Sequence, residues 1–316
     1  MSDLLGPAYA AARWGWYLAA FMVLGASGFA PFLFRNTPLP PRLRGAFPQV
    51  AADLSRRAAR IGGLGAVALL GFGLVRLWLQ TVSLLDPGEP VTLEFLGTVL
   101  GTGWGRGWAV QGGAALAALA GFSMARSGSQ AGWLLAGLAA LLTAAGTGMT
   151  GHAATAEAGR LGWLLDALHV GLGGLWLGGL AVMVLAGIPA CNRLESDRQP
   201  TAIRLLVADF SRRARVAAPV GIGLGIGLAA RYLGWGWPLR FTASSYGWVL
   251  AGKVAVVAGL AAIGAYNWKV LQPRVGEPGG GGGPRLRRSG LLELGFGLLV
   301  LLLTAILVAL PFSEEM

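Results

Sequence analysis

Two histidines, His152 and His169, are the only imidazole side chains in this chain of 316 residues. They flank Gly159-Arg160, where we predict a turn between two apolar helices, because glycine readily takes the left-handed backbone conformation beside a helix end. Two antiparallel helices joined there carry the rings at nearly the same depth, about 12 Å below the turn at about 1.5 Å per residue. Level imidazoles on neighbouring helices are able to share one ligand.

Two methionines extend this candidate site. Met149 lies three residues before His152 and therefore on the same helix face, and Met22 falls at a comparable depth in the first apolar block. Imidazole nitrogen and thioether sulfur together suit copper, particularly Cu(I). Two level imidazoles are also how a helix pair holds haem b, so the residues leave both copper and haem b open.

Four charged residues lie within long apolar blocks, away from their ends: Arg76, Asp166, Lys253 and Glu293. A charge at the centre of a bilayer costs at least about 2.5–3.5 kcal/mol, so such residues usually face other helices and find polar partners. The first three are expected in one half of the membrane, as a polar cluster that supports the site. Asp166 precedes His169 by three residues and is placed to orient its ring. Glu293 is expected to meet Asn267, Lys269 or another basic residue near the other membrane face.

The composition indicates that the chain lies in a membrane, where charged side chains are costly to bury. Apolar residues make up 55% of the chain, charged residues only 12%, and mean hydropathy is +0.62. Soluble domains carry about 25% charged residues. The apolar blocks exceed the roughly 18 residues needed to span a bilayer as a helix, and they lack the alternation of a barrel strand. We predict an all-α polytopic membrane helix bundle with about eight transmembrane helices, near residues 12–34, 60–84, 106–125, 131–158, 161–188, 206–234, 246–270 and 289–311.

The positive charge predicts the orientation of this bundle. Most lysines and arginines fall in the loops after the first, third, fifth and seventh spans, which the positive-inside rule places in the cytoplasm. Both termini are therefore expected outside the cytoplasmic (inner) membrane. Because the net charge of +11 is explained by these loops and helix ends, we expect membrane lipid rather than nucleic acid as the partner.

Glycine is abundant, and in lipid it lets helix backbones approach closely. The pairs Gly174/Gly178, Gly221/Gly225 and Gly223/Gly227 have the spacing of helix-packing seams. We find no nucleophilic serine motif, no pair of metalloprotease histidines on one helix and no ATP-binding loop, so an enzyme is not expected.

Several short segments resemble the bacterial copper resistance protein D family over residues 145–311. They are Gly151-His152, Leu165-Asp166-Ala167-Leu168-His169, Leu175-Trp176-Leu177-Gly178-Gly179-Leu180, Phe210-Ser211-Arg212, Tyr246-Gly247 with Lys253 and Asn267, and Arg287-Arg288 with Glu293 and Leu310-Pro311. Residues 1–144, the first four spans, match only in pattern. A histidine expected in the first span is absent, and Trp14-Gly15-Trp16-Tyr17 stands there instead. Two regions are therefore expected, residues 1–144 and residues 145–316.

The resemblance implies an inner-membrane protein that moves copper inward, for copper uptake, resistance or supply to copper enzymes. It implies a periplasmic copper-binding partner of the copper resistance protein C type. His152 and His169 are then candidate copper ligands, with Asp166 and Lys253 as supporting residues. Two other hypotheses stay open: a haem b electron-transfer protein that uses the same histidines, and a non-catalytic membrane subunit or assembly factor.

Overall fold

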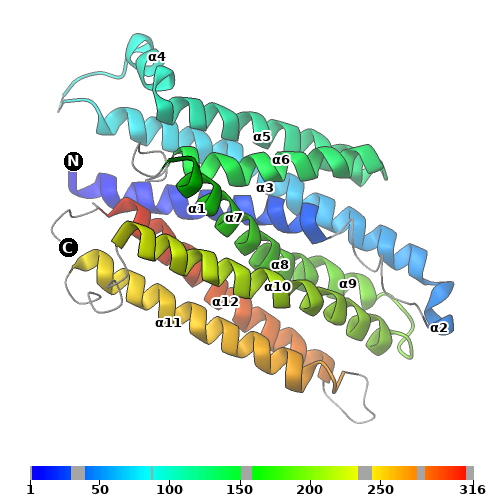
Figure 1. Cartoon of the computed structure of the whole chain (residues 1–316). Coiled ribbons are helices and arrows are strands. Elements are labelled where there is room, and N and C mark those ends of the chain that lie inside the picture. The colour runs from blue at the N-terminus through cyan, green and yellow to red at the C-terminus, as the bar shows by residue number, and fades with distance from the viewer. Residues whose placement is uncertain are drawn as a thin grey trace.

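The computed structural model describes residues 2–29, 40–86, 88–150, 159–233, 244–275 and 282–310. Every regular element in these ranges is helical, which confirms the predicted all-α class for the described part of the chain. The long helices run side by side along one axis (Figure 1). The first half of the chain forms α1 (Ser2–Phe29), α2 (Pro41–Arg44), α3 (Phe47–Ser83), α4 (Leu93–Gly101), α5 (Gly103–Arg126) and α6 (Gln130–Met149).

One long helix opens the second half, and two stretches of it have wider, π-helical turns. It consists of α7 (Gly159–Gly173), η3 (Gly174–Gly178), α8 (Gly179–Val182), η4 (Met183–Gly187) and α9 (Ile188–Cys191). It is followed by α10 (Gln199–Leu233), α11 (Ser245–Tyr266) with its π-helical continuation η6 (Asn267–Leu271), and α12 (Gly282–Ala309).

Seven helices in the described residues are long and apolar enough to cross a membrane, so this is a multi-pass membrane protein. They cover Phe47–Ser83, Gly103–Arg126, Gln130–Met149, Gly159–Cys191, Gln199–Arg231, Ser245–Leu271 and Arg285–Ala309. Each coincides with a predicted span. The predicted count of eight also requires α1, which has 28 residues and contains Arg13, Trp14, Trp16 and Tyr17.

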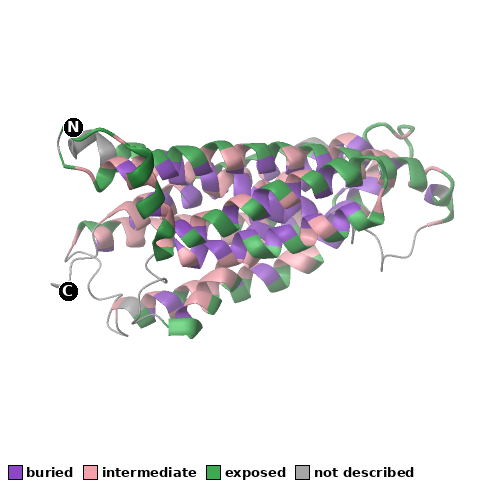
Figure 2. Cartoon of the chain, turned by 90° about the horizontal axis from the view of Figure 1, so that it is seen from above, coloured by how far each residue is buried: buried purple, intermediate pink, exposed green. Residues whose placement is uncertain are grey.

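Helix α1 nevertheless occupies the middle of the bundle. It packs against α3, α6, α12 and the long helix 159–191. Ala20, Val23 and Ala26 on α1 are completely buried. Figure 2 shows buried residues turned toward the interior of the bundle and exposed ones turned outward. The outward residues include large apolar side chains such as Leu74 and Trp78, as expected of helices that face lipid.

The closest helix contact is the crossing of α1 with the long helix 159–191. A β-carbon at Gly178 would overlap the carbonyl oxygen of Phe21, and one at Gly25 would overlap the backbone of Gly178. Gly174 faces Leu24 across the same crossing. The predicted Gly174/Gly178 seam is therefore confirmed, since only glycine lets the two backbones touch.

The two seams predicted on α10 had different outcomes. Gly221 and Gly225 face α7, where their β-carbon positions lie near Leu172 and His169. No atom of the described residues lies within 4 Å of the β-carbon positions of Gly223 and Gly227, so the prediction of a seam was wrong for this pair. Glycine spacing alone does not tell which face of a helix turns toward the bundle.

The bundle has two unlike ends. At one, which we call the terminal end, α1 begins and α12 finishes, together with the end of α6 and the starts of α5, α7 and α11 (Figure 1). At the other, which we call the basic end, α3, α10 and α12 begin. The arginines at the basic end include Arg56, Arg57, Arg60, Arg204, Arg285, Arg287 and Arg288.

The turn between α6 and α7 differs from the prediction. The predicted span 131–158 ends early, at Met149, where the N–H of Thr150 bonds back to the carbonyl of Thr147. Gly159 has the predicted left-handed backbone, with φ +59. The equal depth expected for the two histidines relied on a helix that reaches residue 158, so it no longer follows. His152 itself lies outside the described residues.

Candidate functional site

Two arginines are buried together near the terminal end. Arg13 on α1 is 7% exposed and Arg76 on α3 is 2% exposed. Arg13 donates to the backbone oxygen of Thr150 at 3.0 Å, and Arg76 donates to the hydroxyl oxygen of the same residue at 3.1 Å. Arg76 also donates to Gln111 Oε1 on α5 at 3.0 Å, and its guanidinium lies 5.1 Å from the centre of the Trp16 ring. Side chains from three helices therefore converge on the residue that caps α6.

The hydroxyl groups of Thr150 and Thr147 extend this cluster to Asp166 on α7. The Thr150 hydroxyl lies 3.4 Å from the backbone oxygen of Thr147, and the Thr147 hydroxyl contacts Asp166 Oδ2 on α7 at 3.3 Å. Gln111 supports the turn by donating to Gly146 O at 2.6 Å. We call the connected set Arg13, Arg76, Gln111, Thr147, Thr150 and Asp166 the terminal polar network. It includes two of the three charged residues expected to cluster, Arg76 and Asp166.

His169 lies one helical turn further along α7 and faces α10. Its Nδ1 is 2.8 Å from the backbone oxygen of Gly221. A carbonyl oxygen only accepts hydrogen bonds, so Nδ1 carries the proton and Nε2 keeps its lone pair. A β-carbon at Gly225 would lie 2.9 Å from His169 Cε1, so the absence of a side chain there makes room for the ring. Such a fixed tautomer is the usual arrangement of a histidine that binds a metal.

Lys253 on α11 is the third member of the expected cluster. Its ammonium lies close enough to Asp166 and His169 to interact electrostatically with both. No ion pair in the described part of the chain includes Lys253, so it contributes charge at a distance rather than a direct contact.

The predicted sulfur donors face other helices. The β-carbon of Met22 packs against Gly65 of α3, and that of Met149 against Gly107 of α5. His169 faces α10 instead. In the described ranges no cluster of three or more His, Cys, Asp or Glu side chains has the geometry of a metal site, and His152 lies outside them.

The comparisons with protein-family models identify the family. The model described as copper resistance protein D matches residues 204–307. The model described as copper resistance protein D-like, N-terminal domain, matches residues 1–163, more than half of the chain. The chain belongs to the copper resistance protein D family. The N-terminal match extends the assignment to the half where the sequence offered only a pattern of spans. No curated protein and no solved structure matches the chain significantly.

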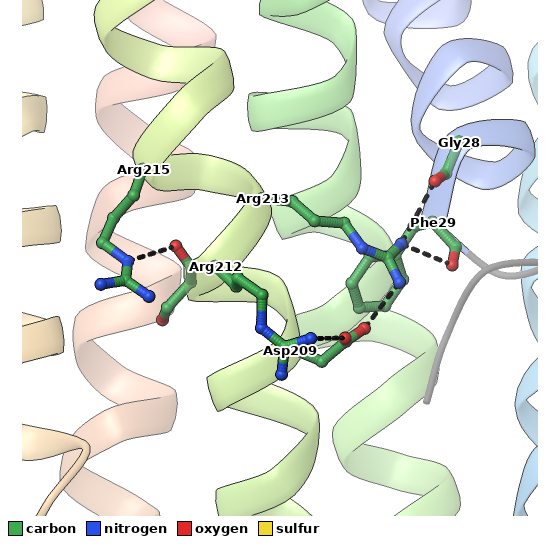
Figure 3. A network of polar contacts seen from close by, with 7 residues as sticks. Gly28, Phe29, Asp209, Arg212, Arg213 and Arg215 are labelled. Atoms are coloured by element: carbon green, nitrogen blue, oxygen red, sulfur yellow. Dashed lines mark hydrogen bonds and ion pairs between the residues drawn. The ribbon is translucent and has the colours of Figure 1, made fainter. Parts of the chain in front are cut away.

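In this copper resistance protein D family member, Arg212 of the segment Phe210-Ser211-Arg212 belongs to a group of polar contacts between α10 and the last residues of α1 (Figure 3). Arg213 donates to the carbonyl oxygens of Gly28 and Phe29 at 3.3 and 3.1 Å, which caps the end of α1. Asp209, only 3% exposed, accepts from Arg213 at 2.7 Å. The Phe29 and Phe210 rings pack edge to face beside them. This part of the family resemblance therefore has a structural role, since it fastens α10 to α1.

Two further family residues, Asn267 and Glu293, form a pair in the half of the bundle nearer the basic end. Asn267 Nδ2 donates to Glu293 Oε2 at 2.9 Å, as predicted for Glu293. Both side chains are buried, and a β-carbon at Gly264 would lie 3.0 Å from Glu293 Oε1. Asn267 begins the π-helical segment η6, which turns its amide toward α12.

Sequence reasoning missed most of the terminal polar network. Arg13 looked like an ordinary basic residue at the end of a span, and Gln111, Thr147 and Thr150 carry no charge. A usable signal was present for Arg13 alone, because it lies well inside the 28-residue helix α1.

Proposed function

We propose that this family member handles copper in the cytoplasmic (inner) membrane of a bacterium, as a transporter that moves copper inward. The single observation that supports this most is the hydrogen bond from His169 Nδ1 to Gly221, which leaves Nε2 available to a metal. Copper is the cargo, and Nε2 of His169 is its proposed ligand. His152 is the further candidate donor, because imidazole nitrogen suits copper, whereas Met22 and Met149 pack toward α3 and α5.

We infer that copper reaches His169 from the terminal end of the bundle, past the terminal polar network. Arg76 and Asp166 are members of this network, and Lys253 on α11 adds positive charge near Asp166 and His169. A periplasmic copper-binding protein of the copper resistance protein C type delivers the metal there. This partner is proposed from the family, and the terminal end is the surface it would meet.

Copper content and the visible spectrum test the proposal together. The protein is purified in detergent, loaded with Cu(I), desalted and assayed for copper, and its spectrum is recorded before and after dithionite. We expect copper in a stoichiometric amount and no Soret band. A Soret band that shifts on reduction would instead indicate haem b. Neither copper nor haem would favour a subunit or assembly factor and would reject the copper site.

The proposed orientation has eight transmembrane helices, α1 included, with both termini outside and the basic end in the cytoplasm. The chain's one cysteine, Cys191, is buried, so single introduced cysteines report accessibility. We expect a membrane-impermeant maleimide to label Glu89→Cys in intact spheroplasts but Gly280→Cys only after lysis. Glu89 is exposed beyond the end of α3, and Gly280 lies in the glycine-rich linker before α12. The reverse labelling pattern would overturn the orientation.

A further inference from the structure

A pocket opens at the terminal end, beside the buried arginines. Its volume is about 390 Å³, within the range of roughly 300–1,000 Å³ that holds small ligands. It lies between α1, α3, α5 and α12, and its lining includes Tyr9, Arg13, Gln80, Trp104, Thr150 and Ala309. Its lining also includes the apolar side chains of Leu79 on α3 and Val308 on α12. The pocket thus combines a buried cation with a surface suited to an apolar group.

The positive charge behind this pocket has no directly paired carboxylate in the part of the chain that the structure describes, and Asp166 acts on Arg13 only at a distance. No ion pair there includes Arg13 or Arg76. Their acceptors are neutral oxygens, from Tyr9 and Thr150 for Arg13 and from Gln111 and Thr150 for Arg76. Two guanidinium groups that share one threonine inside a membrane bundle repel each other and lose hydration, so a nearby anion would be strongly stabilising.

Unsatisfied donors accompany this charge. Within the described residues, the Nε atoms of Arg13 and Arg76 are buried without a hydrogen-bond partner, and the buried indole Nε1 of Trp104 makes at most a weak contact with the Tyr9 hydroxyl. Arg13 and Trp104 both line the pocket, and Thr150 connects Arg13 to Arg76 directly behind it. Buried N–H groups are rarely left unpaired in native proteins. Donors from two different helices, Arg13 on α1 and Trp104 on α5, suit an oxyanion with several oxygens, and guanidinium groups bind phosphate well.

We propose that this pocket is a binding site for a phosphate-type oxyanion, carried either by the headgroup of a phospholipid in the surrounding leaflet or by free phosphate. Arg13 contacts the anion, Trp104 donates to it, and Arg76 adds charge from behind. The apolar side chains of Leu79 and Val308 accommodate the glycerol or first acyl carbons when the source is a lipid. The site is separate from His169 and does not depend on copper.

Phosphate and lipid binding are measured on the full chain, each with its own probe. Inorganic phosphate is titrated by calorimetry into delipidated protein in a neutral detergent, with chloride at equal ionic strength as the reference. In a second arm, phosphatidylglycerol and a neutral diacylglycerol are compared by native mass spectrometry. We expect Arg13→Gln to weaken binding of the phosphate-bearing ligand by about tenfold or more, because a hydrogen bond to a charged group contributes about 1.5–3 kcal/mol.

Two further variants make the result decisive. Ala309→Phe fills the pocket from α12 without touching a guanidinium, so it should abolish binding even if Arg13→Gln folds poorly. Arg106→Gln removes an exposed arginine at the same end of the bundle and should leave binding unchanged. Binding of phosphate in the first arm assigns the free ion, and binding of phosphatidylglycerol alone assigns the lipid. The proposal is overturned if neither binds, or if Arg13→Gln or Ala309→Phe binds as well as the native chain.

Discussion

Replacing His169 by alanine is expected to abolish stoichiometric copper retention and to weaken Cu(I) binding by at least about 100-fold. The variant loses the proposed ligand nitrogen itself, and changes to groups that merely orient a ligand already cost about 10–100-fold. Cu(I) affinity is measured by competition with a chromogenic chelator, on protein whose folding is checked by its melting temperature. Transport of copper into vesicles should fall in parallel.

Two neighbouring variants separate loss of a ligand from loss of packing. Gly225→Ala leaves the imidazole in place but puts a β-carbon 2.9 Å from its Cε1, so the ring must shift and affinity should fall by about tenfold. Leu168→Ala changes the adjacent residue, which is 46% exposed on the outer face of α7, and should leave affinity unchanged. Native copper affinity in His169→Ala would reject His169 as a ligand.

Replacing Gly178 by leucine is expected to prevent assembly of the native bundle, at a cost above about 3 kcal/mol. Overpacking a core usually costs about 1–3 kcal/mol, and here the added atoms overlap backbone, which has no alternative rotamer. The β-carbon alone would collide with the carbonyl oxygen of Phe21 on α1. Folded yield is measured by fluorescence-detected size-exclusion chromatography, and stability by thermal unfolding in detergent.

Gly223→Leu provides the matched control for this change. No atom lies within 4 Å of the β-carbon position of Gly223, so the same substitution on α10 should alter stability by less than about 0.5 kcal/mol. Equal losses in both variants would show that glycine matters here through helix flexibility. A folded Gly178→Leu protein would mean that α1 and the long helix 159–191 cross elsewhere.

The sequence by itself determined the helices and their class. Each of the seven apolar helices lies where hydropathy placed it, because lipid demands about 20 apolar residues per span whatever the neighbouring helices do. It also limited the expected partners of Glu293 to Asn267, Lys269 or another basic residue, because a buried carboxyl needs a partner, and Asn267 is the one that the structure shows. The family resemblance at residues 145–311 could also be recognised from the sequence alone, because it consists of short segments in a fixed order.

Only the tertiary structure decided which side chains meet. Arg13 and Thr150 are 137 positions apart, and their hydrogen bond depends on how α1 is rotated against the end of α6. The rotation of α10 about its own axis likewise turns Gly225 toward His169 and leaves Gly223 without a neighbour among the described residues. The tertiary structure also decided where α6 ends, at Met149, and therefore which residues form the terminal polar network. Hydropathy is averaged along one helix and therefore predicts where a span lies. Which face of that helix turns toward the bundle is set by the close contacts it makes with several other helices at once.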